Sequence, residues 1–178
     1  MPTGIWSEPE LRVATMLSVL EAFQQFVGIA GSSGEDAAGL ALERVHYEGL
    51  PEPEDDETGQ YTLDELEDYR PCAIVTVPAK NGWRARSTAE QTWVPSGRVI
   101  VDLYRSLTTN RHGLPTAADI QDFRDDVGEI IEGLLGLPWS EPYLAVRGVE
   151  VIDGPFWGPP DMVPNEGLWI GVQIGMDW

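Results

Sequence analysis

The sequence predicts an α+β fold, a largely antiparallel sheet of about five strands with two main amphipathic helices on one face. Two observations predict it. Apolar residues recur at helical spacing in two long segments, and strand-like segments stand as a group between those helices and again at the end of the chain. The expected order is therefore α-α-β-β-β-α-β-β, in which the second helix is the weaker one.

The leading helix is expected over residues 10–27. Ser7 can cap it, Glu10 stands at the capping-box position, and Pro9 is tolerated in the first turn. Helical spacing is shown by Val13, Leu17, Leu20, Phe23 or Gln24, and Val27, with Met16 alongside. A weaker helix is expected from Ser33 to Val45.

The strongest helical pattern covers residues 117–135. Its apolar stripe consists of Ile120, Phe123, Val127, Ile130, Ile131 and Leu134. Carboxylates stand four residues apart in two pairs, Asp122 with Asp126 and Asp125 with Glu129. This spacing suits either a shared ion or a solvent-facing surface. We favour the surface, because neither long helix has a histidine that would complete a di-metal site.

Five segments have strand character. They are residues 72–77, 83–88, 98–104, 143–152 and 168–178. Residues 78–82 suit a hairpin connection between the first two. The last segment alternates strictly, with Leu168, Ile170, Val172, Ile174 and Met176 on one face and Trp169, Gly171, Gln173, Gly175 and Asp177 on the other. This alternation is typical of a half-buried strand.

The acidic charge of the chain disfavours some classes of function and favours others. The chain has 30 acidic and 11 basic residues, a formal net charge of −19, and the stretch from Glu48 to Asp68 contains no Lys or Arg. Such a surface repels phosphate, so the composition disfavours a direct grip on nucleic acid. It favours a surface that attracts cations, docks on a basic partner or keeps the protein in solution.

The length of 178 residues suits a single domain over 1–178, with an acidic helix-loop insertion at about residues 34–69. The N-terminus lacks the basic and apolar blocks of a signal peptide, and no apolar run is long enough to span a membrane. We therefore expect folding in the cytoplasm. The single cysteine, Cys72, lies in an apolar run and is expected to be a small buried hydrophobe.

Residues 54–65 partly match the calcium loop of EF-hands. Gly59 falls at the sixth position and Glu65 at the twelfth, where the loop needs a sharp turn and a bidentate carboxylate. Asp56 and Thr58 fall at the third and fifth positions. The first position is not Asp, the eighth is aromatic, and no second copy is present to form a pair. The segment is either a solvated acidic loop, which we favour, or a calcium site with Asp56, Thr58 and Glu65 as ligands.

No catalytic constellation is visible in the sequence. The two histidines are His46 and His112, and there is no HExxH motif and no Gly-x-Ser-x-Gly elbow. The glycine-rich residues 28–34 lack the Lys of a phosphate-binding loop and follow a helix, not a strand. We therefore predict a protein that is not an enzyme and that needs no cofactor.

The order of elements resembles that of the tail-terminator and neck (head-tail joining) proteins of long-tailed bacteriophages. The resemblance is carried by the helix 10–27, the strands 72–77, 83–88 and 98–104, the helix 117–135, and the closing strands 143–152 and 168–178. It implies a structural virion protein, made in the host cytoplasm, that forms a ring of about six copies at the head-proximal end of the tail tube. Such rings end tube polymerisation and join the tail tube protein to the connector or stopper protein. DNA passes through the lumen without specific binding.

A head-to-tail ring needs two different complementary patches on each subunit. We expect one at residues 156–160 and the last strand, because Trp supplies a large contact area at low entropic cost. The candidates there are Phe156, Trp157, Trp169 and Trp178. The second patch is expected in the loop 106–115, with Arg111 and His112, and no membrane contact is expected. The competing class is a monomeric, acidic, calcium-responsive binding domain that uses residues 54–65.

Overall fold

The computed structural model has the α+β fold that the sequence predicts. It describes residues 9–29, 35–47, 69–78, 84–87, 93–107, 114–139, 143, 145–157 and 169–178. The helices among these residues are α1 (Pro9–Val19), α2 (Glu21–Phe26), α3 (Glu35–Leu42) and α5 (Ala117–Gly136). The strands are β1 (Val45–His46), β2 (Cys72–Thr76), β3 (Arg84–Ser87), β4 (Trp93–Ser96), β5 (Arg98–Ser106), β6 (Gly148–Trp157) and β7 (Trp169–Asp177).

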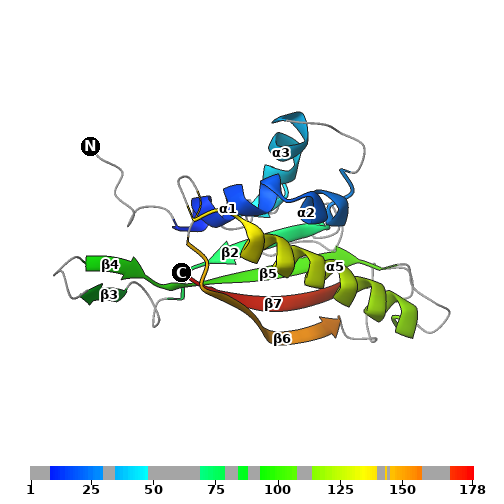
Figure 1. Cartoon of the computed structure of the whole chain (residues 1–178). Helices are drawn as coiled ribbons and strands as arrows, with labels where there is room; N and C mark the ends of the chain where they lie inside the picture. The colour runs from blue at the N-terminus through cyan, green and yellow to red at the C-terminus, as the bar shows by residue number, and fades with distance from the viewer. Residues whose placement is uncertain are drawn as a thin grey trace, which may run out of the picture.

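Within the described part of the chain, five strands form the main sheet in the order β1-β2-β5-β7-β6. β5 and β7 pair antiparallel along their whole length, from Arg98 opposite Asp177 to Ser106 opposite Trp169. β2 and β6 also pair antiparallel with their neighbours, whereas β1 is parallel to β2. The helices lie on one face of this sheet (Figure 1). The predicted arrangement of helices on one face of a mostly antiparallel sheet is thus confirmed.

The core lies between the helices and the sheet. Alternate residues of β5 and β7 face the helices and are buried: Val99, Val101, Leu103, Ile170, Val172, Ile174 and Met176. The stripe predicted for α5 is confirmed, with Phe123, Val127, Ile130 and Leu134 buried. A capping box starts this helix: Thr116 Oγ1 accepts from the Asp119 N–H, and the Asp119 carboxylate accepts from the Thr116 N–H. Local capping and burial of the stripe therefore agree on where α5 begins.

The continuous helix predicted over residues 10–27 was wrong, because the chain forms two helices there. The backbone is extended at Leu20, between α1 and α2 (φ −77°, ψ 125°). The side-chain amide of Gln24 donates to the carbonyl of Ser18 at 2.8 Å and so satisfies an acceptor at the end of α1. The change of direction brings Phe23 and Phe26 into the core, where their ring centroids lie 6.2 Å apart.

The second predicted helix is shorter than expected. It ends at Leu42, because Val45 and His46 form β1 on the edge of the sheet. The backbone N–H of Ala73 donates to the carbonyl of Arg44 at 2.9 Å, and Val45 is buried. Pairing with a strand that is distant in sequence has here overridden the helical spacing of the segment.

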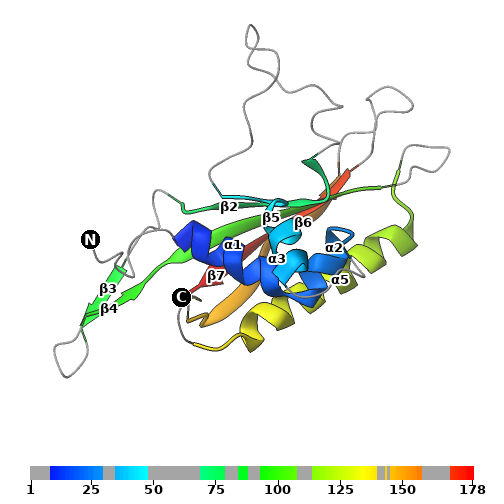
Figure 2. The same cartoon turned by 90° about the horizontal axis from the view of Figure 1, so that it is seen from above.

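The predicted strand 83–88 was expected to pair with the strand before it, and this was wrong. β3 pairs with β4, a strand that the sequence pattern does not indicate, and the two form a separate antiparallel hairpin. β2 pairs with β5 instead. We call this hairpin the β3–β4 arm. It projects beyond the end of the main sheet at which β5 begins (Figures 1 and 2).

β6 lies later in the chain than the predicted strand 143–152. It shifts register twice along β7, between Val151 and Asp153 and between Asp153 and Phe156, and in this way continues to Trp157. Residues 153–157, which lie between the last two predicted strands, are therefore strand as well. Among the described residues, no helix combines the length and the apolar character needed to cross a membrane.

Candidate functional site

The main sheet has a second face, opposite to the helices, which we call the open face. In Figure 1 the helices all lie above the sheet, so none of them covers it. Because side chains alternate along a strand, the residues between the core residues of β5 and β7 belong to this face. Described residues of the open face come from three strands. They are Arg98, Asp102 and Tyr104 of β5, Glu150, Ile152 and Phe156 of β6, and Trp169, Gly171, Gln173, Gly175 and Asp177 of β7. They form three groups of different chemistry.

A charged group occupies the end of the open face at which β5 begins. The Arg98 guanidinium donates from Nε to Asp177 Oδ1 at 2.8 Å and from Nη2 to Asp177 Oδ2 at 2.9 Å. Arg98 Nη2 also lies 2.7 Å from Glu150 Oε1. The hydrogen bond to Asp177 raises the pKa of Arg98 further above its usual range. One arginine thus joins β5 to both β7 and, across it, β6.

An amide–carboxylate pair lies in the middle of the face. Gln173 and Asp102 stand opposite each other in the β5–β7 register, and Gln173 Nε2 donates to Asp102 Oδ1 at 2.8 Å. Burial raises the pKa of Asp102, and the hydrogen bond from Gln173 opposes that rise. The carboxylate is therefore held in a less favourable environment than a solvated one.

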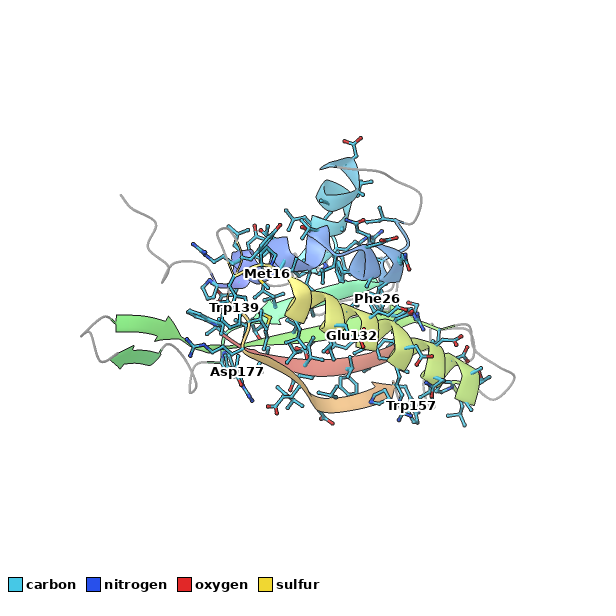
Figure 3. All side chains as sticks on the ribbon, in the orientation of Figure 1. Met16, Phe26, Glu132, Trp139, Trp157 and Asp177 are labelled. Atoms are coloured by element: carbon cyan, nitrogen blue, oxygen red, sulfur yellow. The ribbon has the colours of Figure 1, made fainter. Side chains whose placement is uncertain are left out.

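Three aromatic rings gather at the other end of the open face. Tyr104, Phe156 and Trp169 contact one another edge to face, with ring centroids 5.6 to 6.2 Å apart. Gly171 makes room for them, because a Cβ there would lie 2.8 Å from the Tyr104 ring and 2.9 Å from the Phe156 ring. Figure 3 shows the two ends of the sheet, with Asp177 at the charged end and Trp157 beside the aromatic end. This cluster combines apolar area with polar ring edges, as protein interfaces do.

A groove of about 290 Å³ runs along the other side of β6, between that strand and α5. Its lining is mostly apolar and includes Val127 and Ile131 of α5 and Val151 of β6. Val151 is 50% exposed, although Ile174, opposite it on β7, is buried. Arg124 lines the groove as well. Since β6 is the edge strand of the main sheet, the groove lies at the border of the described sheet.

The structure places some of the predicted site residues and not others. The candidate calcium ligands Asp56, Thr58 and Glu65, and the interface candidates Arg111 and His112, lie outside the described residues. Phe156 and Trp169 belong to the aromatic cluster of the open face. Trp157 is 40% exposed at the end of β6.

Trp178 is a core residue, which corrects its expected place in a surface patch. It is 6% exposed. Its backbone N–H donates to the carbonyl of Gly97 at 3.1 Å, and the N–H of Gly97 donates to the carbonyl of Trp178 at 3.1 Å. A Cβ at Gly97 would lie 3.1 Å from the indole ring. The last residue thus extends the β7 pairing and fixes the root of the β3–β4 arm.

The carboxylates of α5, all of them among the described residues, do not gather into a metal site. Asp126 is ion-paired with Arg105, whose guanidinium carbon lies 5.5 Å from the centroid of the Phe123 ring. Asp125 accepts a hydrogen bond from Gln121 at 2.7 Å. Among the described residues, no three His, Cys, Asp or Glu side chains gather in a way that could hold a metal ion.

Among the described residues, the two remaining reactive side chains are Cys72 on β2 and His46 on β1. Cys72 is buried, as predicted, and burial raises the pKa of its thiol to about 11. His46 makes an edge contact with the Tyr69 ring at 5.6 Å, and burial lowers the pKa of His46. A thiol that resists ionisation is a poor nucleophile, so the positions of these groups suit structure more than catalysis.

Sequence reasoning missed the Arg98 ion pairs and the role of Gly171. The alternation of the last strand was a usable signal, since Gly171 and Gly175 share a face with Trp169 and Gln173. It identified two faces, but it could not give the register that brings Arg98 opposite Asp177. No protein-family model matches the chain, and no curated protein is similar to it in sequence.

Proposed function

We propose that this chain is a structural virion protein that forms a ring at the head-proximal end of a phage tail tube. The observation that carries the proposal is the arrangement of elements. The leading helices and α5 lie on one face of a mostly antiparallel sheet in which β6 and β7, the last two strands along the chain, are adjacent. This is the order of elements that resembles the tail-terminator and neck proteins. The ring would end tube polymerisation and join the tail tube protein to the connector or stopper.

The open face and the edge strand β6 support an assembly role. They offer an aromatic cluster and the exposed side chain of Trp157, which are the residue types that carry binding energy in protein interfaces. We propose that the end of β6 with Phe156, Trp157 and Trp169 is one of the two subunit patches. Such a surface suits a partner protein better than a small molecule.

The acidic charge supports the passage of DNA. A net charge of −19 per chain would be multiplied in a ring. A lumen with that sign repels phosphate, so the duplex would slide through without being held. The virion would be the site of action, after synthesis in the host cytoplasm.

The test is the mass of the purified chain, measured by light scattering after size exclusion at high concentration, with and without millimolar calcium. We expect a species of about six times the 19.6 kDa of one chain, independent of calcium, and rings in electron micrographs. A monomer that changes its shape only when calcium is added would support the calcium-binding class instead. Where the chain is monomeric alone, the same measurement is repeated with tail tubes, and failure to bind their ends would refute the proposal.

A matched pair of variants sharpens this test. Trp157→Ala removes a 40% exposed ring from the proposed patch, and Trp139→Ala removes a 71% exposed ring on the opposite side of the molecule (Figure 3). We expect Trp157→Ala to weaken assembly and Trp139→Ala to leave it unchanged, with both variants folded. Equal effects of the two changes would contradict the proposed position of the patch.

A further inference from the structure

The outermost strand of the main sheet, β6, has an outer edge with which no described strand pairs. Residues 148–151 of β6 pair one to one with β7, so the edge is regular over this stretch. A regular edge presents backbone N–H and C=O groups with which another strand can pair. Pro155 has no backbone N–H and limits such pairing to the residues before it. The edge can therefore accept a short added strand beside residues 148–151.

Apolar side chains are exposed on both sides of this edge. Val151, on the helix side, is 50% exposed, and Ile152, on the side of the open face, is 41% exposed. Sheet edges that remain in water commonly carry charged side chains instead. An added strand would place its own side chains beside both residues, because side chains alternate between the two faces of a sheet. Strand addition would thus bury the apolar area that the edge leaves exposed.

The groove between α5 and β6 lies beside Val151, and a glycine of α5 leaves room in it. This residue, Gly128, lines the groove in the interior of the helix. Nothing lies within 4 Å of a Cβ built at Gly128, so the packing of this chain does not require a glycine there. Alanine would make the helix itself more stable. The space beside Gly128 is therefore free for the close approach of another molecule.

The charge at the groove is positive, although the chain as a whole is acidic. Among the described residues that line the groove, Arg124 is the one with a charge, and it is exposed. None of the six carboxylates of α5 stands three or four residues away from Arg124, the spacing that brings side chains together on a helix. Arg124 also forms no ion pair among the described residues. A carboxylate of another molecule would complement it.

We propose that the outer edge of β6 binds an extended, acidic segment of a partner protein as an added strand. Apolar side chains of this segment enter the groove beside Val151 and Gly128, and one of its carboxylates pairs with Arg124. The groove, at about 290 Å³, is at the lower end of the range for small-molecule sites. A strand needs room only for its side chains, because backbone pairing with β6 holds the rest. This contact does not depend on the proposed ring.

The probe is an array of peptides of about seven residues, with Val, Ile or Leu at alternate positions, one Asp or Glu, and Thr elsewhere. A matched array has Lys in place of the acid. Labelled full-length protein is applied in about 0.3 M NaCl, which screens the general attraction of an acidic chain for Lys. We expect the acidic array to bind more tightly, although the net charge of the chain opposes it. The tightest peptide is then measured in solution by fluorescence anisotropy.

Two pairs of variants test the position of the site, after circular dichroism has shown that each is folded. Arg124→Glu should weaken the acidic peptide about tenfold and should bind its Lys counterpart more tightly than Arg147→Glu does. These two variants have the same net charge, and Arg147 is exposed and does not line the groove. Gly128→Leu fills the groove and should also weaken binding about tenfold. Gly39→Leu, at a glycine of α3 with equally open surroundings, should leave binding unchanged.

Methylation of the peptide nitrogens tests for strand addition itself. Along an added strand, alternate N–H groups face β6, so methylating one alternate set should abolish binding and methylating the other set should not.

Several outcomes would overturn the inference. They are an acidic array that does not bind, a Lys array that binds as tightly, equal effects of the two leucine variants, and binding that survives methylation of either set. Rings that form from a chain binding none of the peptides would refute this contact and leave the ring proposal standing. Peptide binding by a chain that never forms rings or binds tail tubes would support the contact and refute the ring.

Discussion

The two faces of the main sheet are built from the same strands but are held by different interactions. On the helix-covered face, residues such as Leu103 and Ile174 are apolar and fully buried, and any of them could be exchanged for another hydrophobe of similar size at modest cost. On the open face, neighbouring residues depend on specific partners, as Arg98 does on Asp177 and Gly171 does on the Tyr104 ring. The covered face provides most of the stability, whereas the ion pairs and ring contacts of the open face are not needed to bury the core.

The largest effect should come from the covered face. Ile174→Ala removes a fully buried side chain of β7, which stands opposite Val101 and Val151. We expect the free energy of unfolding in urea to fall by about 2–5 kcal/mol. The matched change on the open face is Ile152→Ala, whose side chain is 41% exposed and should cost about 1 kcal/mol. Equal losses would mean that the open face is as well buried as the core.

The fold followed from the sequence wherever one pattern decided the outcome. The apolar stripe of α5 and the alternation of β7 are local, and both were predicted, whereas the Thr116–Asp119 capping box was found in the structure. The break at Leu20 and the pairing of β3 with β4 are local, but the residue pattern did not indicate them. The strand at Val45 depends on pairing with Ala73, far away in sequence, which a local pattern does not contain. For the same reason, the candidate site could be predicted only in part from the sequence. Trp169 was identified from its residue type, but the partners of Arg98 follow from the register of two strands.

A second comparison is between two glycines, Gly171 of β7 and Gly148 of β6. Gly171→Ala places a Cβ within 3 Å of the Tyr104 and Phe156 rings, so the aromatic cluster must move. We expect a loss of about 1–3 kcal/mol and a changed near-ultraviolet circular dichroism spectrum. Gly148→Ala is the control, because nothing lies within 4 Å of its new Cβ. If both variants unfold at the same urea concentration, the cluster is not packed as tightly as the structure indicates.

A smaller effect is expected at the charged end of the open face. Arg98→Met removes the bonds to Asp177 and Glu150, whose side chains are both at least half exposed. Exposed ion pairs contribute little, so we expect a loss of about 0.5–1 kcal/mol at low salt that shrinks in concentrated NaCl. Arg147 is an exposed arginine that has no ion pair among the described residues. Arg147→Met should therefore change neither the free energy of unfolding nor its dependence on salt. A salt-independent loss at Arg98 would show that its aliphatic stem, and not its charge, is what matters.

The smallest change should be a gain of stability. Asp102 is a partly buried carboxylate whose pKa is raised by burial, so its charged form is disfavoured in the folded state. Asp102→Asn keeps a hydrogen-bond acceptor for Gln173 and removes this charge, and we expect the variant to be about 0.5 kcal/mol more stable at pH 7. Because a raised pKa contributes stability below the unfolded value of 3.8 and loses it as pH rises, the difference between variant and wild type should close as the pH falls towards that value. Urea unfolding of both proteins between pH 7 and the acid range measures this difference. A gap that stays constant with pH would mean that the carboxylate of Asp102 is solvated, and the middle of the open face would then be wetter than its geometry indicates.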